Sequence, residues 1–229
     1  MTLATEGTTK KKPHRIGVML GLIRETLKPY PKAMLFELAE RGYESVFQQL
    51  LACLISIRTL DEVSLPVSLA LLERARTPEE LLGLEEEEIV RLIERSTFAR
   101  QKAGRMRQIA TIAITHYNGE IPCEFDALTD LPGVGPKCAN LVLGIACQRG
   151  AIGVDIHVHR ITNRWGYVAA ATPERTLKAL EEKLPREHWV EINELLVPFG
   201  KHVCTGRLPR CSSCPVLAYC QQVGVTKLR

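Results

Sequence analysis

The chain has 229 residues, of which 45% are hydrophobic and 24% are charged, as is usual for a folded protein with a sizeable core. Its formal net charge of +4 permits a nucleic-acid partner without requiring one. No apolar run approaches the roughly 20 residues that span a bilayer, and no signal-peptide type of stretch follows the basic N-terminus, so we expect a cytoplasmic protein with no membrane partner.

Nearly every segment after a flexible basic tail at residues 1–13 has the periodicity of a helix. Thr77-Pro78 and Thr172-Pro173 each place a capping residue before a proline, which is typical of a helix start. Only AIGVDIHVH at 151–159 resembles a strand. The expected helices span residues 14–28, 32–40, 43–56, 60–75, 86–95, 99–117, 124–129, 136–148, 156–167, 173–183 and 187–198. The pattern predicts an all-α fold.

One stretch of the chain is strongly basic. No acidic residue lies between Glu94 and Glu120, and five basic residues gather in RSTFARQKAGRMR. They are Arg95, Arg100, Lys102, Arg105 and Arg107. The stretch is either an exposed basic helix or a surface that faces phosphate groups.

The segment LPGVGPKCANLVLGIAC, residues 131–147, places a tight glycine turn directly before a helix. Gly133 and Gly135 can adopt backbone conformations that other residues avoid, and Pro136 suits the first helical turn. Such a start exposes backbone N–H groups that attract phosphate. The segment is either a phosphate-binding hairpin or a plain corner between two helices.

Lys137 lies in the first turn of this helix and is expected to point away from the core. The helix dipole and any desolvation favour the neutral amine, which is a nucleophile. Eighteen residues later, Asp155 occupies the N-cap position of the next expected helix. A solvated lysine and a structural cap are the ordinary roles, but an amine and a carboxylate near a phosphate-binding hairpin indicate a reactive site.

The eight cysteines fall into two sets. The C-terminal set has the spacing C-x6-C-x2-C-x5-C and consists of Cys204, Cys211, Cys214 and Cys220. Four thiolates suit tetrahedral zinc or an iron–sulfur cluster, and spacing alone does not choose between them. The other set lies in apolar segments and is expected to act as small core residues; it comprises Cys53, Cys123, Cys138 and Cys147.

Taken together, LPGVGPKCANLVL and VDIHVHRITNR resemble the helix-hairpin-helix and aspartate signature of base-excision DNA glycosylases. The lysine within the hairpin is similar to that of the endonuclease III branch. The resemblance covers residues 43–220 and implies two helical lobes with a cleft between them. A six-helix barrel at 43–149 would carry the hairpin, while residues 14–42 and 150–229 would form a discontinuous second lobe with a 4Fe-4S cluster loop.

The resemblance further implies a bifunctional DNA glycosylase and AP lyase of base excision repair. Such an enzyme removes oxidised pyrimidines from double-stranded DNA and cuts 3′ to the abasic site by β-elimination. Lys137 and Asp155 would be catalytic, and the four C-terminal cysteines would hold a 4Fe-4S cluster, with zinc as second choice. We expect a monomer associated with the nucleoid. Expected DNA-binding residues are Arg58, Gly133, Val134, Gly135, His157, Arg207 and Arg210.

Two positions depart from the family pattern. In LISIRTLDE, residues 54–62, Arg58 stands where the family typically has the glutamine that enters the space left by the flipped base. Leu208 stands where members often have lysine. Two other functions therefore stay open: a monofunctional glycosylase for alkylated or mismatched bases, and a non-catalytic DNA-binding protein.

Overall fold

The computed structural model describes residues 11–229, and within that range the chain forms helices and no strand. The all-α prediction is confirmed, and residues 151–155 are irregular chain that leads into a helix. The longer helices are α1 (Ile16–Leu27), α2 (Met34–Glu40), α3 (Val46–Ser56), α4 (Asp61–Arg74), α6 (Glu86–Leu92), α7 (Ala99–Tyr117), α9 (Pro136–Ile145), α10 (Ile156–Trp165), α11 (Pro173–Lys183) and α12 (Glu191–His202). The short elements are α5 (Pro78–Leu82), α8 (Phe125–Thr129), η1 (Arg186–His188), η2 (Cys211–Ser213) and η3 (Leu217–Tyr219).

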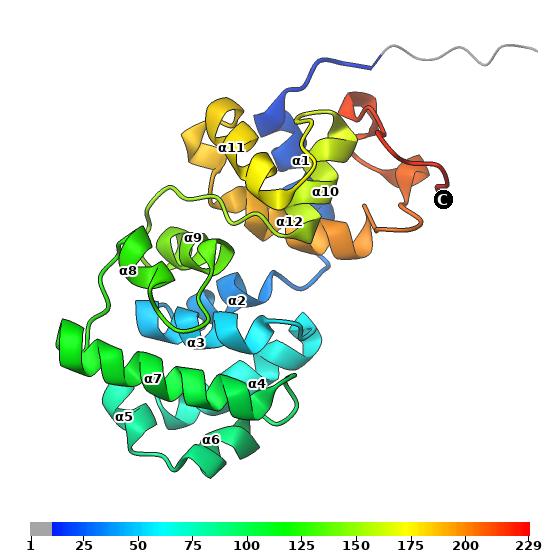
Figure 1. Cartoon of the computed structure of the whole chain (residues 1–229). Coiled ribbons are helices and arrows are strands. Elements are labelled where there is room, and N and C mark those ends of the chain that lie inside the picture. The colour runs from blue at the N-terminus through cyan, green and yellow to red at the C-terminus, as the bar shows by residue number, and fades with distance from the viewer. Residues whose placement is uncertain (1–10) are drawn as a thin grey trace, which may run out of the picture.

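The helices divide into two groups, each around its own apolar core (Figure 1). The first core takes side chains from α2 to α9, and the second takes them from α1, α10, α11, α12 and the C-terminal segment. In Figure 1 the first group fills the lower half of the molecule and the second group the upper half. No helix within residues 11–229 is both long and apolar enough to cross a membrane.

The chain passes between the two groups near the predicted lobe boundaries. The predicted second lobe includes residues 14–42, but Met34, Leu35 and Leu38 of α2 pack in the first core. Residues 1–10 of the expected tail lie outside the described residues. The N–H of Lys12, which belongs to the same expected tail, donates to the carbonyl of Ala218 at 2.8 Å.

Local signals explain several helix starts. Ser45 with Gln48 and Thr77 with Glu80 form reciprocal capping boxes at α3 and α5. The expected end at residue 198 is wrong, because α12 continues through Pro198 to His202. The proline costs a backbone hydrogen bond, but it lies on a stretch that the fold buries, so packing outweighs the loss.

Two cysteines differ from the prediction. Cys123 and Cys147 form a disulfide, with Cα atoms 5.8 Å apart, rather than acting as separate core residues. Cys123 precedes α8 and Cys147 follows α9, so the bridge closes a loop that contains both helices and the turn between them. Spacing gave no signal for this pairing, because the 24-residue separation becomes short only after α8 and α9 fold against each other.

Candidate active site and DNA-binding surface

The glycine turn between α8 and α9 has the expected open helix start. Gly133 has a φ of +83°, a conformation that favours glycine, and the N–H of Val134 donates to the carbonyl of Leu131 at 3.1 Å. Gly135 is the N-cap with φ −99° and ψ 174°, an extended backbone that any residue adopts, so the expected special conformation is found only at Gly133. No side chain caps α9. The first N–H groups of the helix are thus available to a ligand.

Lys137 is the second residue of α9, and its side chain is exposed, as the sequence predicts. It lines a cavity of about 210 Å³ together with the hairpin residues Gly135 and Pro136. The opposite wall comes from the second helix group and includes Val154 and Leu177. The amine therefore stands where the two groups of helices face each other.

Asp155 caps α10 as predicted. Its Oδ1 accepts hydrogen bonds from the N–H groups of His157 at 2.9 Å and Val158 at 2.8 Å. These two bonds fix the carboxylate at the positive end of the α10 dipole. Asp155 does not itself line the Lys137 cavity, which the neighbouring Val154 reaches.

His157 belongs to a packed group behind Asp155. Arg160 donates through one nitrogen to His157 Nδ1 at 3.1 Å, to the carbonyl of Gly200 at 3.1 Å and to that of Cys204 at 3.0 Å. Burial lowers the pKa of His157, and the charge of Asp155 opposes that shift. The imidazole is half-buried and is hydrogen-bonded to Arg160, one turn further along α10.

Arg58 lies in the loop between α3 and α4, where its φ is +57°. Its guanidinium stands over the ring of Phe98, 5.8 Å from the centroid. Phe98 is 58% exposed and also has a φ of +57°. Sequence reasoning missed Phe98; an aromatic residue inside a basic segment of an aromatic-poor chain was the available signal.

Lys102, placed with the expected phosphate-facing residues, is buried instead. Its Nζ donates to the carbonyls of Ile55 and Ile57 at 2.7 and 2.9 Å, and so satisfies the open end of α3. It also reaches Thr59 Oγ1 at 3.3 Å. Lys102 thus fixes the loop that presents Arg58, and the exposure that both interpretations of the basic stretch expect is wrong for this residue.

The four C-terminal cysteines line one small cavity beside α10 and α12. Burial raises the pKa of Cys214 to about 12, and negative charge on the other three thiols acts in the same direction. Arg164 donates to Cys204 Sγ at 3.5 Å, and the N–H of Gln222 donates to Cys220 Sγ at 3.3 Å. Within residues 11–229 no three His, Cys, Asp or Glu side chains are arranged to hold a metal ion as they stand. The donor set, four clustered thiols that repel one another as anions, fits a cationic centre.

The loop between the first two of these cysteines is exposed. Arg207 and Arg210 both lie on its surface, and Leu208 between them is 40% exposed. The loop is held from α10, because Arg164 donates to the carbonyl of Thr205 at 2.5 Å. Both arginines are thus free to meet an anionic partner.

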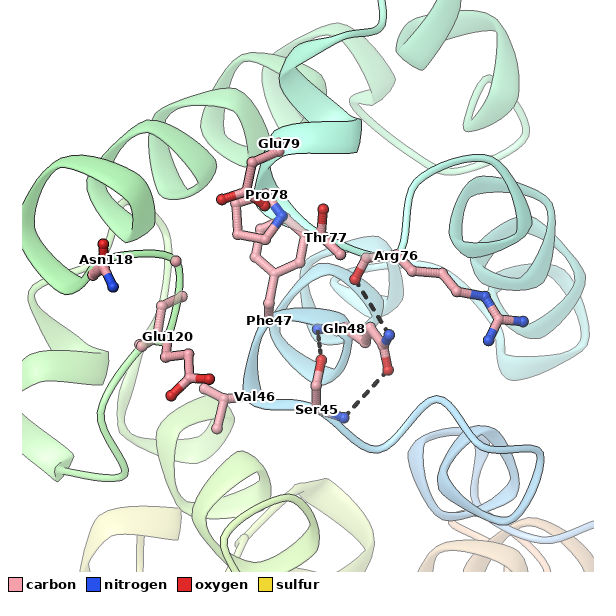
Figure 2. Close-up of a pocket in the computed structure, with 12 residues that line it drawn as sticks. Ser45, Val46, Phe47, Gln48, Arg76, Thr77, Pro78, Glu79, Asn118 and Glu120 are labelled. Atoms are coloured by element: carbon pink, nitrogen blue, oxygen red, sulfur yellow. Dashed lines mark hydrogen bonds between the residues drawn. The ribbon is translucent and has the colours of Figure 1, made fainter.

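A separate cavity of about 570 Å³ lies among the first residues of α3, the first residues of α5 and the end of α7 (Figure 2). Its polar groups are largely used within the protein: Gln48 donates to the carbonyl of Arg76 and completes the capping box with Ser45. None of the predicted site residues lines this cavity. Cavity size alone therefore does not lead to the predicted site residues.

The fold and the hairpin define the class. The sequence pattern of the HhH-GPD superfamily of base excision DNA repair proteins matches residues 51–186, and the chain belongs to that family. Within it, the endonuclease III of Thermotoga maritima is 38% identical over 200 residues, which cover 87% of this chain and 91% of that protein. The endonuclease III of Bacillus subtilis is 32% identical, with coverage of 80% and 84%.

Solved structures agree. An endonuclease III trapped as a covalent intermediate with DNA matches with a TM-score of 0.78 at 30% identity, covering 91% of this chain and 95% of that one. A thermostable thymine-DNA glycosylase, 21% identical with a TM-score of 0.75, shares the fold. The two-lobe helical architecture expected from the sequence is therefore that of endonuclease III.

Proposed function

We propose that the chain is a bifunctional DNA glycosylase and AP lyase that acts on oxidised pyrimidines and abasic sites in double-stranded DNA. One observation carries the proposal: the exposed Lys137 amine stands beside the open hairpin, on a cavity that both helix groups line. A glycosylase that only activates water has no use for an amine there. The endonuclease III relatives support the same reaction class.

The reaction begins with binding. The free N–H groups of the hairpin and nearby basic side chains hold the phosphates, and the damaged nucleotide leaves the base stack. Arg58 of the α3–α4 loop and Phe98, which contact each other, are suited to enter the space that the nucleotide vacates. Arg207 and Arg210 add contacts to the phosphates.

Chemistry then centres on Lys137. The uncharged Nζ attacks C1′, the bond from C1′ to the base breaks, and the base leaves with the bonding electrons and takes up a proton. The sugar opens to a Schiff base on Nζ. Loss of a proton from C2′ then expels the 3′ phosphate oxygen, so the strand is cut 3′ to the site.

Asp155 has a different role. Its carboxylate, held by the N–H groups of His157 and Val158, stabilises positive charge that develops on the sugar and helps deprotonate the attacking amine. His157 keeps the start of α10 in place. The carboxylate is needed most for breaking the glycosidic bond, and less once an abasic aldehyde is already present.

We also propose that Cys204, Cys211, Cys214 and Cys220 hold a 4Fe-4S cluster that stabilises the exposed loop, with zinc as second choice. The fit rests on the four clustered thiols and on the donors that Arg164 and Gln222 direct to them. Absorbance near 400 nm and iron and sulfide analysis of purified protein distinguish the two. In the cell we propose a monomer that works on the nucleoid.

A borohydride trapping experiment tests the reaction. Wild-type protein incubated with abasic duplex should form a covalent adduct, and Lys137→Gln should form none. Lys227→Gln, an exposed lysine near the C-terminus, serves as control and should trap like wild type. Asp155→Asn should lose base release by about 10²- to 10⁴-fold while still trapping preformed abasic DNA. An adduct that persists in Lys137→Gln contradicts the mechanism, and base release without any adduct favours the monofunctional reaction.

A further inference from the structure

The basic stretch of α7 separates into residues with different partners. Arg100 forms an ion pair with Glu87, and Arg107 donates to the carbonyl of Leu84. Lys102 is buried under the α3–α4 loop. The side chain of Arg105, by contrast, makes no ion pair and donates no hydrogen bond to any residue of the described chain 11–229, although it is only half-exposed.

Arg105 lies directly against the glycine hairpin. A Cβ atom added at Gly133 would lie 2.9 Å from Arg105 Cδ, 3.1 Å from Nη1 and 3.3 Å from Nε. The side chain therefore occupies the space that a larger residue at position 133 would need. Glycine at this position serves both the positive φ and the approach of the arginine.

The guanidinium thus contacts the hairpin at Gly133, two residues before Gly135, the N-cap position of α9. The N–H of Val134 is bonded to Leu131, Pro136 has none, and Ala139 bonds to the carbonyl of Gly135. The N–H groups of Gly135, Lys137 and Cys138 precede the first helical bond of α9, and no side chain caps them. An arginine fork and a set of helix N-terminal amides are both groups that bind phosphate.

We propose that Arg105 and the hairpin N–H groups bind the same backbone phosphate of DNA. The inference rests on the proposed binding of abasic duplex and adds a residue from outside the hairpin motif. Because Lys137 follows the hairpin by two residues, the shared phosphate fixes the sugar relative to the amine. Arg105 is therefore a positioning residue: it sets affinity and register, while the bond changes stay at Lys137.

The effect can be sized from counterion release. Each phosphate contact contributes about 0.9 to the slope of log K against log salt. At about 0.1 M salt, relative to about 1 M, one contact therefore raises the affinity about eightfold. We expect Arg105→Met to lose about eightfold in affinity and about 0.9 in slope, because methionine keeps the aliphatic contact with Gly133 but not the charge. Arg105→Lys should recover most of the slope, and Arg100→Met, the ion-paired control on the same helix, should keep the wild-type slope.

The experiment is fluorescence anisotropy of a duplex with a tetrahydrofuran abasic analogue, measured across a salt series. A wild-type slope in Arg105→Met overturns the proposal, and so does an equal loss in Arg105→Lys and Arg105→Met. If wild type binds the duplex but forms no borohydride adduct, the lyase reaction fails while the Arg105 contact is still decided by the slopes.

Discussion

Removing the Cys123–Cys147 disulfide should destabilise the hairpin and its two helices. The bridge joins residues 24 apart, and the closed loop contains α8, the glycine turn and α9. The chain-entropy relation for a loop of this length gives a stabilisation of about 3.5 kcal/mol. That figure is a large part of the stability of an ordinary domain.

A Cys123→Ala, Cys147→Ala double variant is the clean perturbation, because a reductant would also reach the four C-terminal cysteines. Guanidinium unfolding followed by circular dichroism gives the change in free energy, and hydrogen exchange of the α9 amides locates it. We expect a loss of about 2 to 4 kcal/mol, faster exchange in α9 and weaker binding of abasic duplex. The amides of α12, whose side chains pack in the other core, serve as the internal reference for hydrogen exchange.

Two results would refute this reasoning. Alkylation of unreduced protein followed by mass analysis should leave Cys123 and Cys147 unmodified, so labelling of both thiols removes the premise. Equal free energies of unfolding for the double variant and the wild type would show that the disulfide does not stabilise the folded protein. Disulfides are rare in reducing compartments outside hyperthermophiles, so the labelling is done on freshly lysed cells as well.

Three further changes test the packing around the site. Burial lowers the pKa of Lys102 from 10.5 to about 8, so between these pH values the unfolded chain binds more protons than the folded protein. The free energy of unfolding should therefore rise from pH 8 to 10.5, and urea titrations of Lys102→Met should show no such rise. The pair of Lys201 and Asp61, 2.7 Å apart, joins α12 to α4; Asp61→Asn should cost about 0.5 to 1 kcal/mol at low salt and nothing at 1 M salt, as unfolding midpoints will show. Gly200→Ala would place a Cβ 2.3 Å from His157 Nδ1, so base release should fall, and a wild-type rate would show that the α10 start tolerates displacement.

Local rules gave the helices and the two site positions. Proline and capping residues located the starts at Pro78, Pro136 and Pro173, and the Asp155 cap follows from its place before an apolar stripe. These features depend on neighbours within four residues. The roles of Lys137 and Asp155 in catalysis stay predictions until the trapping experiment is done.

Features that depend on distant contacts did not follow from the sequence. Lys102 has the composition of a surface residue, and only the open carbonyls at the end of α3, more than forty positions earlier, give it a buried partner. Cys123 and Cys147 meet because α8 and α9 fold back on each other. The contact between Phe98 and Arg58 likewise joins two loops that lie forty residues apart in the chain, although an aromatic residue in a basic segment was a signal in the sequence.

The hairpin motif is therefore necessary but incomplete as a description of this surface. The disulfide constrains the two ends of the loop, Arg105 packs on Gly133 inside it, and the amides of α9 remain open. Neither the disulfide nor Arg105 lies within LPGVGPKCANLVL or VDIHVHRITNR, the two segments that resemble the family. If the disulfide constrains the loop and Arg105 binds the phosphate, two proteins with the same hairpin sequence can still differ in phosphate affinity and hairpin rigidity. Residues on α7 and at the ends of the loop then set those two properties. Introducing an arginine at the position of Arg105 into a relative that lacks it should then raise the slope of log K against log salt by about 0.9. A substitution confined to the hairpin sequence should leave that slope unchanged.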